Sequence, residues 1–127
     1  MIKQENKYDL EERTFKFAKD VRDLIKEVKK TTSNIEDCKQ LARASASAGA
    51  NYIEANEALS KKDFQMRIKI SRKESRESRF FLRLLDIDEL KLDQLRNSLA
   101  DEAEELRRIF SSILNNSKES KTIRFDS

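Results

Sequence analysis

The chain has 127 residues, which is enough for one domain with a buried core and too few for two independent ones. Charged residues make up 40% of it with a net charge of +3, proline is absent and Gly49 is the only glycine, a composition that favours long helices. Histidine is also absent, which excludes histidine general bases, most zinc sites and the di-iron sites of helical bundles.

The first predicted helix runs from about Asp9, its expected N-cap, to Lys30. Its inner stripe, spaced by three and four residues, is Leu10, Thr14, Phe17, Val21, Leu24 and Val28. The polar stretch 31–34 ends this helix. The second helix has the stripe Ile35, Cys38, Ala42, Ser45, Gly49, Tyr52 and Asn56. Its small central residues predict a close approach to neighbouring helices.

The third predicted helix begins after Ser60, which forms a capping box with Asp63. Its stripe is large at both ends and small in the centre: Phe64, Ile68, Ser71, Ser75, Ser78, Leu82 and Leu85. The acidic run 86–88 supplies an N-cap for the fourth helix, which ends near Asn115. The fourth stripe is Leu92, Leu95, Leu99, Ala103, Leu106, Phe110 and Ile113.

Four helices joined by short connections predict an all-α fold, an antiparallel up-down-up-down four-helix bundle over residues 1–116 with a mobile tail over 117–127. A long coiled-coil assembly is the alternative, although three short polar interruptions favour helices that fold back on each other. The N-terminus has no apolar signal segment, and no apolar stretch approaches the length of a membrane span. With a single cysteine, Cys38, these features predict a cytoplasmic protein without a membrane partner.

No motif for catalysis or cofactor binding is present, so we expect no enzyme activity, no catalytic residue and no cofactor. Cys38 lies on a core stripe without a histidine partner, and its expected role is that of a small buried hydrophobe rather than a nucleophile. Carboxylate pairs at helical spacing make an oxygen-only metal site conceivable, but pairing with nearby cations is the favoured interpretation. Glu54, Asn56 and Lys73 are expected to form a structural polar cluster that fixes helix register.

Basic residues are concentrated in the third helix. Residues 60–85 carry nine basic and three acidic side chains, a net +6, whereas residues 86–116 carry four basic and eight acidic ones, a net −4. One outward stripe contains Lys62, Lys69, Arg72, Arg76, Arg79 and Arg83. Such a stripe can contact the phosphates of nucleic acid. The alternatives are a solvated face or a face neutralised by the acidic fourth helix.

Three apolar residues of the third helix, Met66, Phe80 and Leu84, lie opposite its inner stripe. Because that stripe is already complete, these residues predict an oligomer interface, with a broader core as the alternative. No aromatic residue lies within the basic stripe itself, so base-specific recognition is not expected.

Four segments of the sequence are distinctive: Asp9-Leu-Glu-Glu-Arg-Thr-Phe15, Gln40-Leu-Ala-Arg-Ala-Ser-Ala-Ser-Ala-Gly-Ala-Asn-Tyr-Ile-Glu-Ala55, Ser60-Lys-Lys-Asp-Phe64 and Ile70-Ser-Arg-Lys-Glu-Ser-Arg-Glu-Ser-Arg-Phe-Phe-Leu82. Together they resemble the family of four-helix bundle proteins encoded in intervening sequences of bacterial large-subunit ribosomal RNA genes, over roughly residues 8–114. Two small departures are the alanine-rich run 46–50 and Phe81, where tryptophan is common.

The resemblance implies a basic homopentameric ring of four-helix bundles, related to the accessory protein of diversity-generating retroelements. It makes nucleic acid the leading ligand, with RNA more likely than DNA, and it does not establish ribosome binding. A protein-binding adaptor without nucleic-acid affinity is the alternative function.

Overall fold

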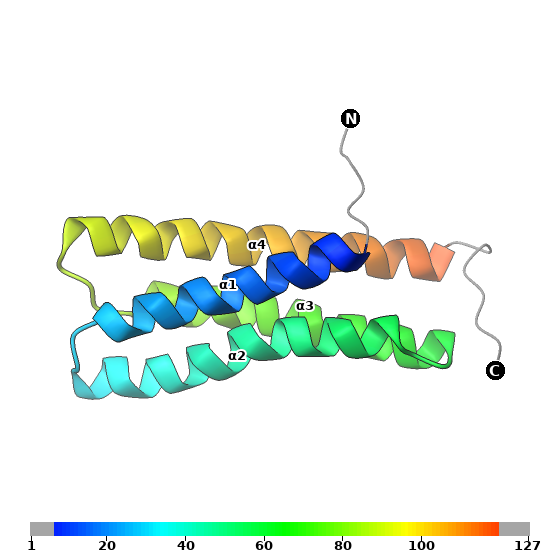
Figure 1. Cartoon of the computed structure of the whole chain (residues 1–127), viewed down its shortest axis with the longest axis horizontal. Coiled ribbons are helices and arrows are strands. Elements are labelled where there is room, and N and C mark those ends of the chain that lie inside the picture. The colour runs from blue at the N-terminus through cyan, green and yellow to red at the C-terminus, as the bar shows by residue number, and fades with distance from the viewer. Residues whose placement is uncertain (1–6, 120–127) are drawn as a thin grey trace.

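A computed structural model describes residues 7–119 of the protein. The described residues form four helices: α1 (Lys7–Glu27), α2 (Thr32–Asn56), α3 (Lys61–Leu84) and α4 (Leu90–Glu119). Successive helices run in opposite directions and lie alongside one another, as Figure 1 shows. The described residues contain no strand. This confirms the predicted all-α four-helix bundle. None of the helices within 7–119 is long and apolar enough to cross a bilayer.

The core contains the predicted inner stripes of α1 and α3 almost unchanged, from Leu10 to Val28 and from Ile68 to Leu85. The predicted inner stripe of α2 was only partly correct. Its first residue, Ile35, is 42% exposed, whereas Leu41, Ala44 and Ala48 are fully buried. The reason is that α2 packs against both α1 and α3, so its alanines on two adjacent sides are covered and the stripe is rotated from the predicted one.

Polar caps define two of the helix starts. Ser60 Oγ accepts a hydrogen bond from Asp63 N at 3.1 Å, which confirms the predicted start of α3. Thr31 caps α2 in the same way, so the polar stretch 31–34 begins α2 rather than ending α1, which already ends at Glu27 instead of Lys30. Asp9 is not a cap, since α1 begins at Lys7 and places Asp9 in its first turn.

The start and end of α4 both differ from the prediction. Its N-terminal amides are bound by Glu89, whose carboxylate accepts from Leu92 N at 2.9 Å, and not by an aspartate of 86–88. The helix continues to Glu119, so the predicted end near Asn115 and the boundary at 116 come too early. Ser117 is fully buried there and accepts from Gln65 Nε2 at 3.2 Å. The polarity of residues 115–119 hid this contact, and the rest of the predicted tail, 120–127, lies outside the described residues.

Candidate nucleic-acid interface

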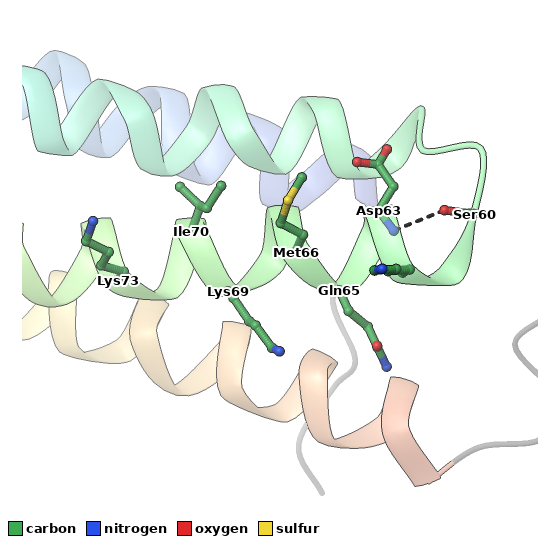
Figure 2. A pocket seen from close by; sticks show the side chains of 8 residues that line it. Ser60, Asp63, Gln65, Met66, Lys69, Ile70 and Lys73 are labelled. Carbon is green, nitrogen blue, oxygen red and sulfur yellow. Dashed lines mark hydrogen bonds between the residues drawn. The ribbon is translucent and has the colours of Figure 1, made fainter.

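The predicted basic stripe follows the junction between α3 and α4. Figure 2 shows Lys69 directed toward α4, in the same sense as Gln65 one turn earlier. Farther along α3, Arg76, Arg79 and Arg83 line a groove whose other wall belongs to α4. The stripe members divide by exposure into four exposed ones, Lys62, Lys69, Arg76 and Arg83, and two half-buried ones, Arg72 and Arg79.

The arginines of the stripe differ from most other arginines by having no acidic partner. Within residues 7–119, six arginines make side-chain hydrogen bonds or ion pairs: Arg13, Arg43, Arg67, Arg96, Arg107 and Arg108. Five make none in that part of the chain: Arg22 of α1 and the four stripe members Arg72, Arg76, Arg79 and Arg83. Unneutralised guanidinium groups are therefore concentrated on one side of α3.

Within residues 7–119, α4 forms no ion pair with the arginines of this stripe, and the α4 carboxylate that lines the groove is held by cations of its own helix. Glu104 lies in a bidentate pair with Arg107, at 2.9 and 2.8 Å, and also accepts from Arg108. The Arg107 hydrogen bonds lower the pKa of the Glu104 carboxyl to about 2. Glu102 is bound by Arg13 across the α1 and α4 junction.

The groove between α3 and α4 has a volume of about 540 Å³. Its lining consists of Lys73, Arg76, Glu77, Arg79, Phe80, Arg83, Glu104 and Arg107. Both of its carboxylates are engaged, Glu104 as described and Glu77 with Arg43 at 3.2 Å. The groove thus combines free guanidinium groups with one exposed aromatic ring, that of Phe80, which the sequence placed on a separate apolar surface.

The three residues of the predicted oligomer interface, Met66, Phe80 and Leu84, are all exposed in the monomer. They do not form one continuous patch, because Met66 and Phe80 lie about 21 Å apart along the helix at about 1.5 Å per residue. The ion pair of Lys73 with Glu77 occupies the same face between them. At the Met66 end, a hollow of about 580 Å³ is lined by Met66 and Ile70, which Figure 2 shows directed toward α2.

The predicted polar cluster of Glu54, Asn56 and Lys73 is not formed. Asn56 instead donates to Glu11 of α1 at 2.8 Å, Lys73 pairs with Glu77, and Glu54 is exposed. The reason is the antiparallel register of α2 and α3. It places Ser71 against Ala48, so that Glu54 and Lys73 lie several turns apart.

A second apolar surface was missed at the sequence level. Phe15 of α1 is 61% exposed, and with Ile53 of α2 it lines a groove of about 310 Å³ over Gly49 and Ala50. Both large apolar residues lie off the predicted inner stripes, and this was the sequence signal that could have revealed the second apolar surface. This groove lies between α1 and α2, away from the junction of α3 and α4.

Neither Cys38 nor the carboxylate pairs form a reactive site in the described residues. Cys38 packs partly buried against the core, and burial raises the pKa of its thiol, which disfavours the nucleophilic thiolate. Glu74 and Glu77 both bind Arg43, at 2.8 and 3.2 Å, so these carboxylates link α3 to α2.

A sequence model of the family described as 23S rRNA-intervening sequence protein matches residues 6–112. The chain belongs to this family. The chain is also similar to the crystal structure of a protein of unknown function from the S23 ribosomal protein family of Bacteroides thetaiotaomicron. The two are 29% identical, with a TM-score of 0.69 over 82% of this chain and 96% of that chain. No curated protein is similar to this chain in sequence.

The family match confirms the resemblance drawn from the sequence. The segment 40–55 forms most of α2 and the segment 70–82 forms the centre of α3. These two segments meet where Ser71 Oγ donates to Ala48 O at 2.8 Å. The recognisable sequence therefore coincides with a direct hydrogen-bonded contact between two helices.

Proposed function

We propose that the chain is a non-enzymatic cytoplasmic protein that binds nucleic acid, with RNA favoured over DNA, through the basic stripe of α3. The supporting observation is that four of the five arginines without a hydrogen bond or ion pair in residues 7–119 belong to this stripe. Free guanidinium groups on a surface are suited to phosphate oxygens, which accept their hydrogen bonds in pairs. The family description, which refers to ribosomal RNA, favours RNA by association.

Binding of this kind is dominated by the release of counterions from phosphates, so its affinity depends steeply on salt. On single-stranded RNA the log–log slope is roughly −0.7 for each phosphate neutralised. Contacts to the backbone also carry little sequence information, so we expect ribosomal RNA fragments and unrelated RNAs to bind with comparable affinity.

The test is a salt titration of binding to ribosomal RNA fragments and to unrelated duplexes, with the parent and an Arg72→Glu/Arg76→Glu variant. The control is Lys26→Glu/Lys91→Glu, which makes the same change of net charge at two exposed lysines that line neither the arginine groove nor the two apolar surfaces. We expect the α3 variant to lose binding and the control variant to keep most of it. A parent that fails to bind at low salt, or equal losses in both variants, contradicts the proposal.

The protein is further proposed to act as a homo-oligomer, with a pentamer favoured. Two exposed apolar surfaces support this: the Met66 and Ile70 hollow on α3, and the Phe15 and Ile53 groove between α1 and α2. Contacts between two different surfaces of neighbouring copies are heterologous, and such contacts build a ring when the rotation between copies closes. Size exclusion with light scattering should give an oligomer for the parent and monomers for Met66→Asp and Phe15→Asp. Leu59→Asp, in the exposed connection before α3, is the control that should remain oligomeric.

The same apolar groove of Phe15 and Ile53 is the observation that favours the second candidate function, a protein-binding adaptor. The adaptor function does not require the unpaired arginines of α3. If the oligomer forms but the parent binds neither RNA nor DNA at low salt, the adaptor function replaces nucleic-acid binding.

A further inference from the structure

Phe80 is the one aromatic ring among the residues that line the groove between α3 and α4. The side chain is 56% exposed, and it lies among Arg76, Arg79 and Arg83, whose guanidinium groups have no partner in the described part of the chain. An exposed ring is common on protein surfaces. An exposed ring surrounded by free guanidinium groups offers two chemistries at once, a flat apolar face and several phosphate ligands.

The ring of Phe80 packs against the ring of its neighbour in sequence, Phe81. Its centroid lies 5.3 Å from that of Phe81, with the two planes at 83°, an edge-to-face contact. Phe81 itself is partly buried and packs against the core. In either edge-to-face arrangement, Phe81 leaves at least one face of Phe80 uncovered, so a planar group can stack there.

Covering Phe80 with a second copy of the chain is the competing use of this ring. Such a contact would also enclose Arg76, Arg79 and Arg83, and the two carboxylates in the groove are already engaged with other cations. Burying guanidinium groups without anions is strongly unfavourable. A ligand that carries both anions and an aromatic ring can pair with the guanidinium groups and also stack on the ring of Phe80.

We infer that the groove binds single-stranded nucleic acid, with an unpaired base stacked on Phe80 and the adjoining phosphates on Arg76, Arg79 and Arg83. This rests on the proposed function and makes it more specific. A duplex presents its phosphates to the arginines but keeps its bases paired inside, where a ring in a groove cannot reach them. Single strands expose the faces of their bases, and stacking on aromatic side chains is the usual way proteins hold them.

The absence of tryptophan from the chain provides a direct readout. Phe80→Trp makes the only tryptophan a reporter of the groove, and stacking of a base on it should quench its fluorescence. Leu59→Trp is the control, because Leu59 is also exposed, at 83%, and lies in neither apolar surface proposed to join copies of the chain. The probes are a labelled single-stranded 12-mer of RNA, the same sequence in DNA, the corresponding duplexes, and inorganic polyphosphate, which carries anions without bases.

We expect both single strands to quench Phe80→Trp, and duplex and polyphosphate to bind without quenching it. Leu59→Trp should show no quenching with any probe. Phe80→Ala should lower the ratio of single-strand to duplex affinity roughly tenfold, the size of one base–aromatic stack. Light scattering should give the same oligomeric state for Phe80→Ala and the parent.

The outcomes separate this inference from the proposed function. A parent that binds single strands and duplex equally, with unquenched Phe80→Trp, overturns base stacking while nucleic-acid binding through α3 stands. A parent that binds no nucleic acid at low salt overturns both. A Phe80→Ala variant that changes oligomeric state while keeping the parent's affinity ratio assigns the ring to an interface between copies and overturns the inference.

Discussion

Gly49 of α2 packs so closely against Thr14 of α1 that a Cβ atom at residue 49 would lie 2.9 Å from Thr14 Oγ1 and 3.1 Å from Thr14 Cβ. Thr14 is itself buried, and its hydroxyl donates to Glu11 O at 2.9 Å, so it cannot easily move away. The only glycine of the chain therefore sets the separation of two helices.

Gly49→Ala should destabilise the protein by about 1–2 kcal/mol. Alanine gains up to about 1 kcal/mol of helix propensity over glycine, but the overpacking against Thr14 typically costs more, about 1–3 kcal/mol. Urea unfolding followed by circular dichroism measures the change. In a Thr14→Ala background, which removes the nearest oxygen, the cost of Gly49→Ala should shrink. A Gly49→Ala variant as stable as the parent would show that the helices separate freely.

Asn34 joins the two connections at one end of the bundle. Its amide Nδ2 donates to Lys29 O and to Asp86 O, each at 3.0 Å, and its Oδ1 accepts from Asp86 N at 2.9 Å. The side chain is almost completely buried. Asn34→Ala leaves these backbone groups without partners, so we expect a loss of about 2–4 kcal/mol in the free energy of unfolding.

Chemical denaturation tests Asn34→Ala against Asn97→Ala on the exposed side of α4, where a change within about 0.5 kcal/mol is expected. Hydrogen exchange should also be faster in both connections of the Asn34→Ala variant. Equal stabilities of the two variants would mean that solvent replaces the bonds of Asn34.

Arg43 and Glu74 form the ion pair that links α2 to α3. The carboxylate of Glu74 is only 9% exposed and accepts from Arg43 Nη1 at 2.8 Å. Its Oε1 is buried without a hydrogen-bond partner. Arg43→Met leaves this buried charge uncompensated and should cost about 3 kcal/mol, whereas Arg43→Met/Glu74→Met should cost less than the single variant. A double-mutant cycle in urea checks this, and simple additivity of the two changes would contradict it.

Glu104 links stability to pH. Because the Arg107 hydrogen bonds lower its pKa in the folded protein to about 2, from an ordinary value of 4.5, its contribution is complete above pH 4.5 and is lost as the pH falls toward 2. Glu104→Gln should therefore cost about 1 kcal/mol at pH 7, since the pair is partly screened by solvent, and almost nothing near pH 2. The control is Glu105→Gln, at an exposed neighbour, for which a change within about 0.5 kcal/mol at pH 7 is expected.

The same Glu104→Gln variant should bind nucleic acid more tightly while it is less stable. Removing the carboxylate frees Arg107 and Arg108 beside the groove, and the salt dependence of binding should become steeper. Fluorescence anisotropy at two salt concentrations measures the effect. Unchanged affinity would place the bound phosphates away from the α4 wall of the groove.

The periodic spacing of apolar residues was sufficient to predict the bundle, because burial of one stripe per helix is a property of each helix alone. Leu10 to Val28 and Ile68 to Leu85 lie inside as predicted. The excess of basic residues over 60–85 likewise pointed to α3 as the basic element. Ser117 escaped prediction since a serine in a polar run carries no sign that Gln65 of another helix will cover it.

Contacts between helices were decided only by the tertiary structure. Glu54 and Lys73 carry opposite charges, and the sequence allowed them to meet. The register that places Arg43 against Glu74 separates them by about nine residues of α2, roughly 13 Å. Phe80 joined the arginine groove for the same reason, because the axial register and rotation of α4 against α3 determine which side chains share a wall. Periodicity within one helix sets neither quantity.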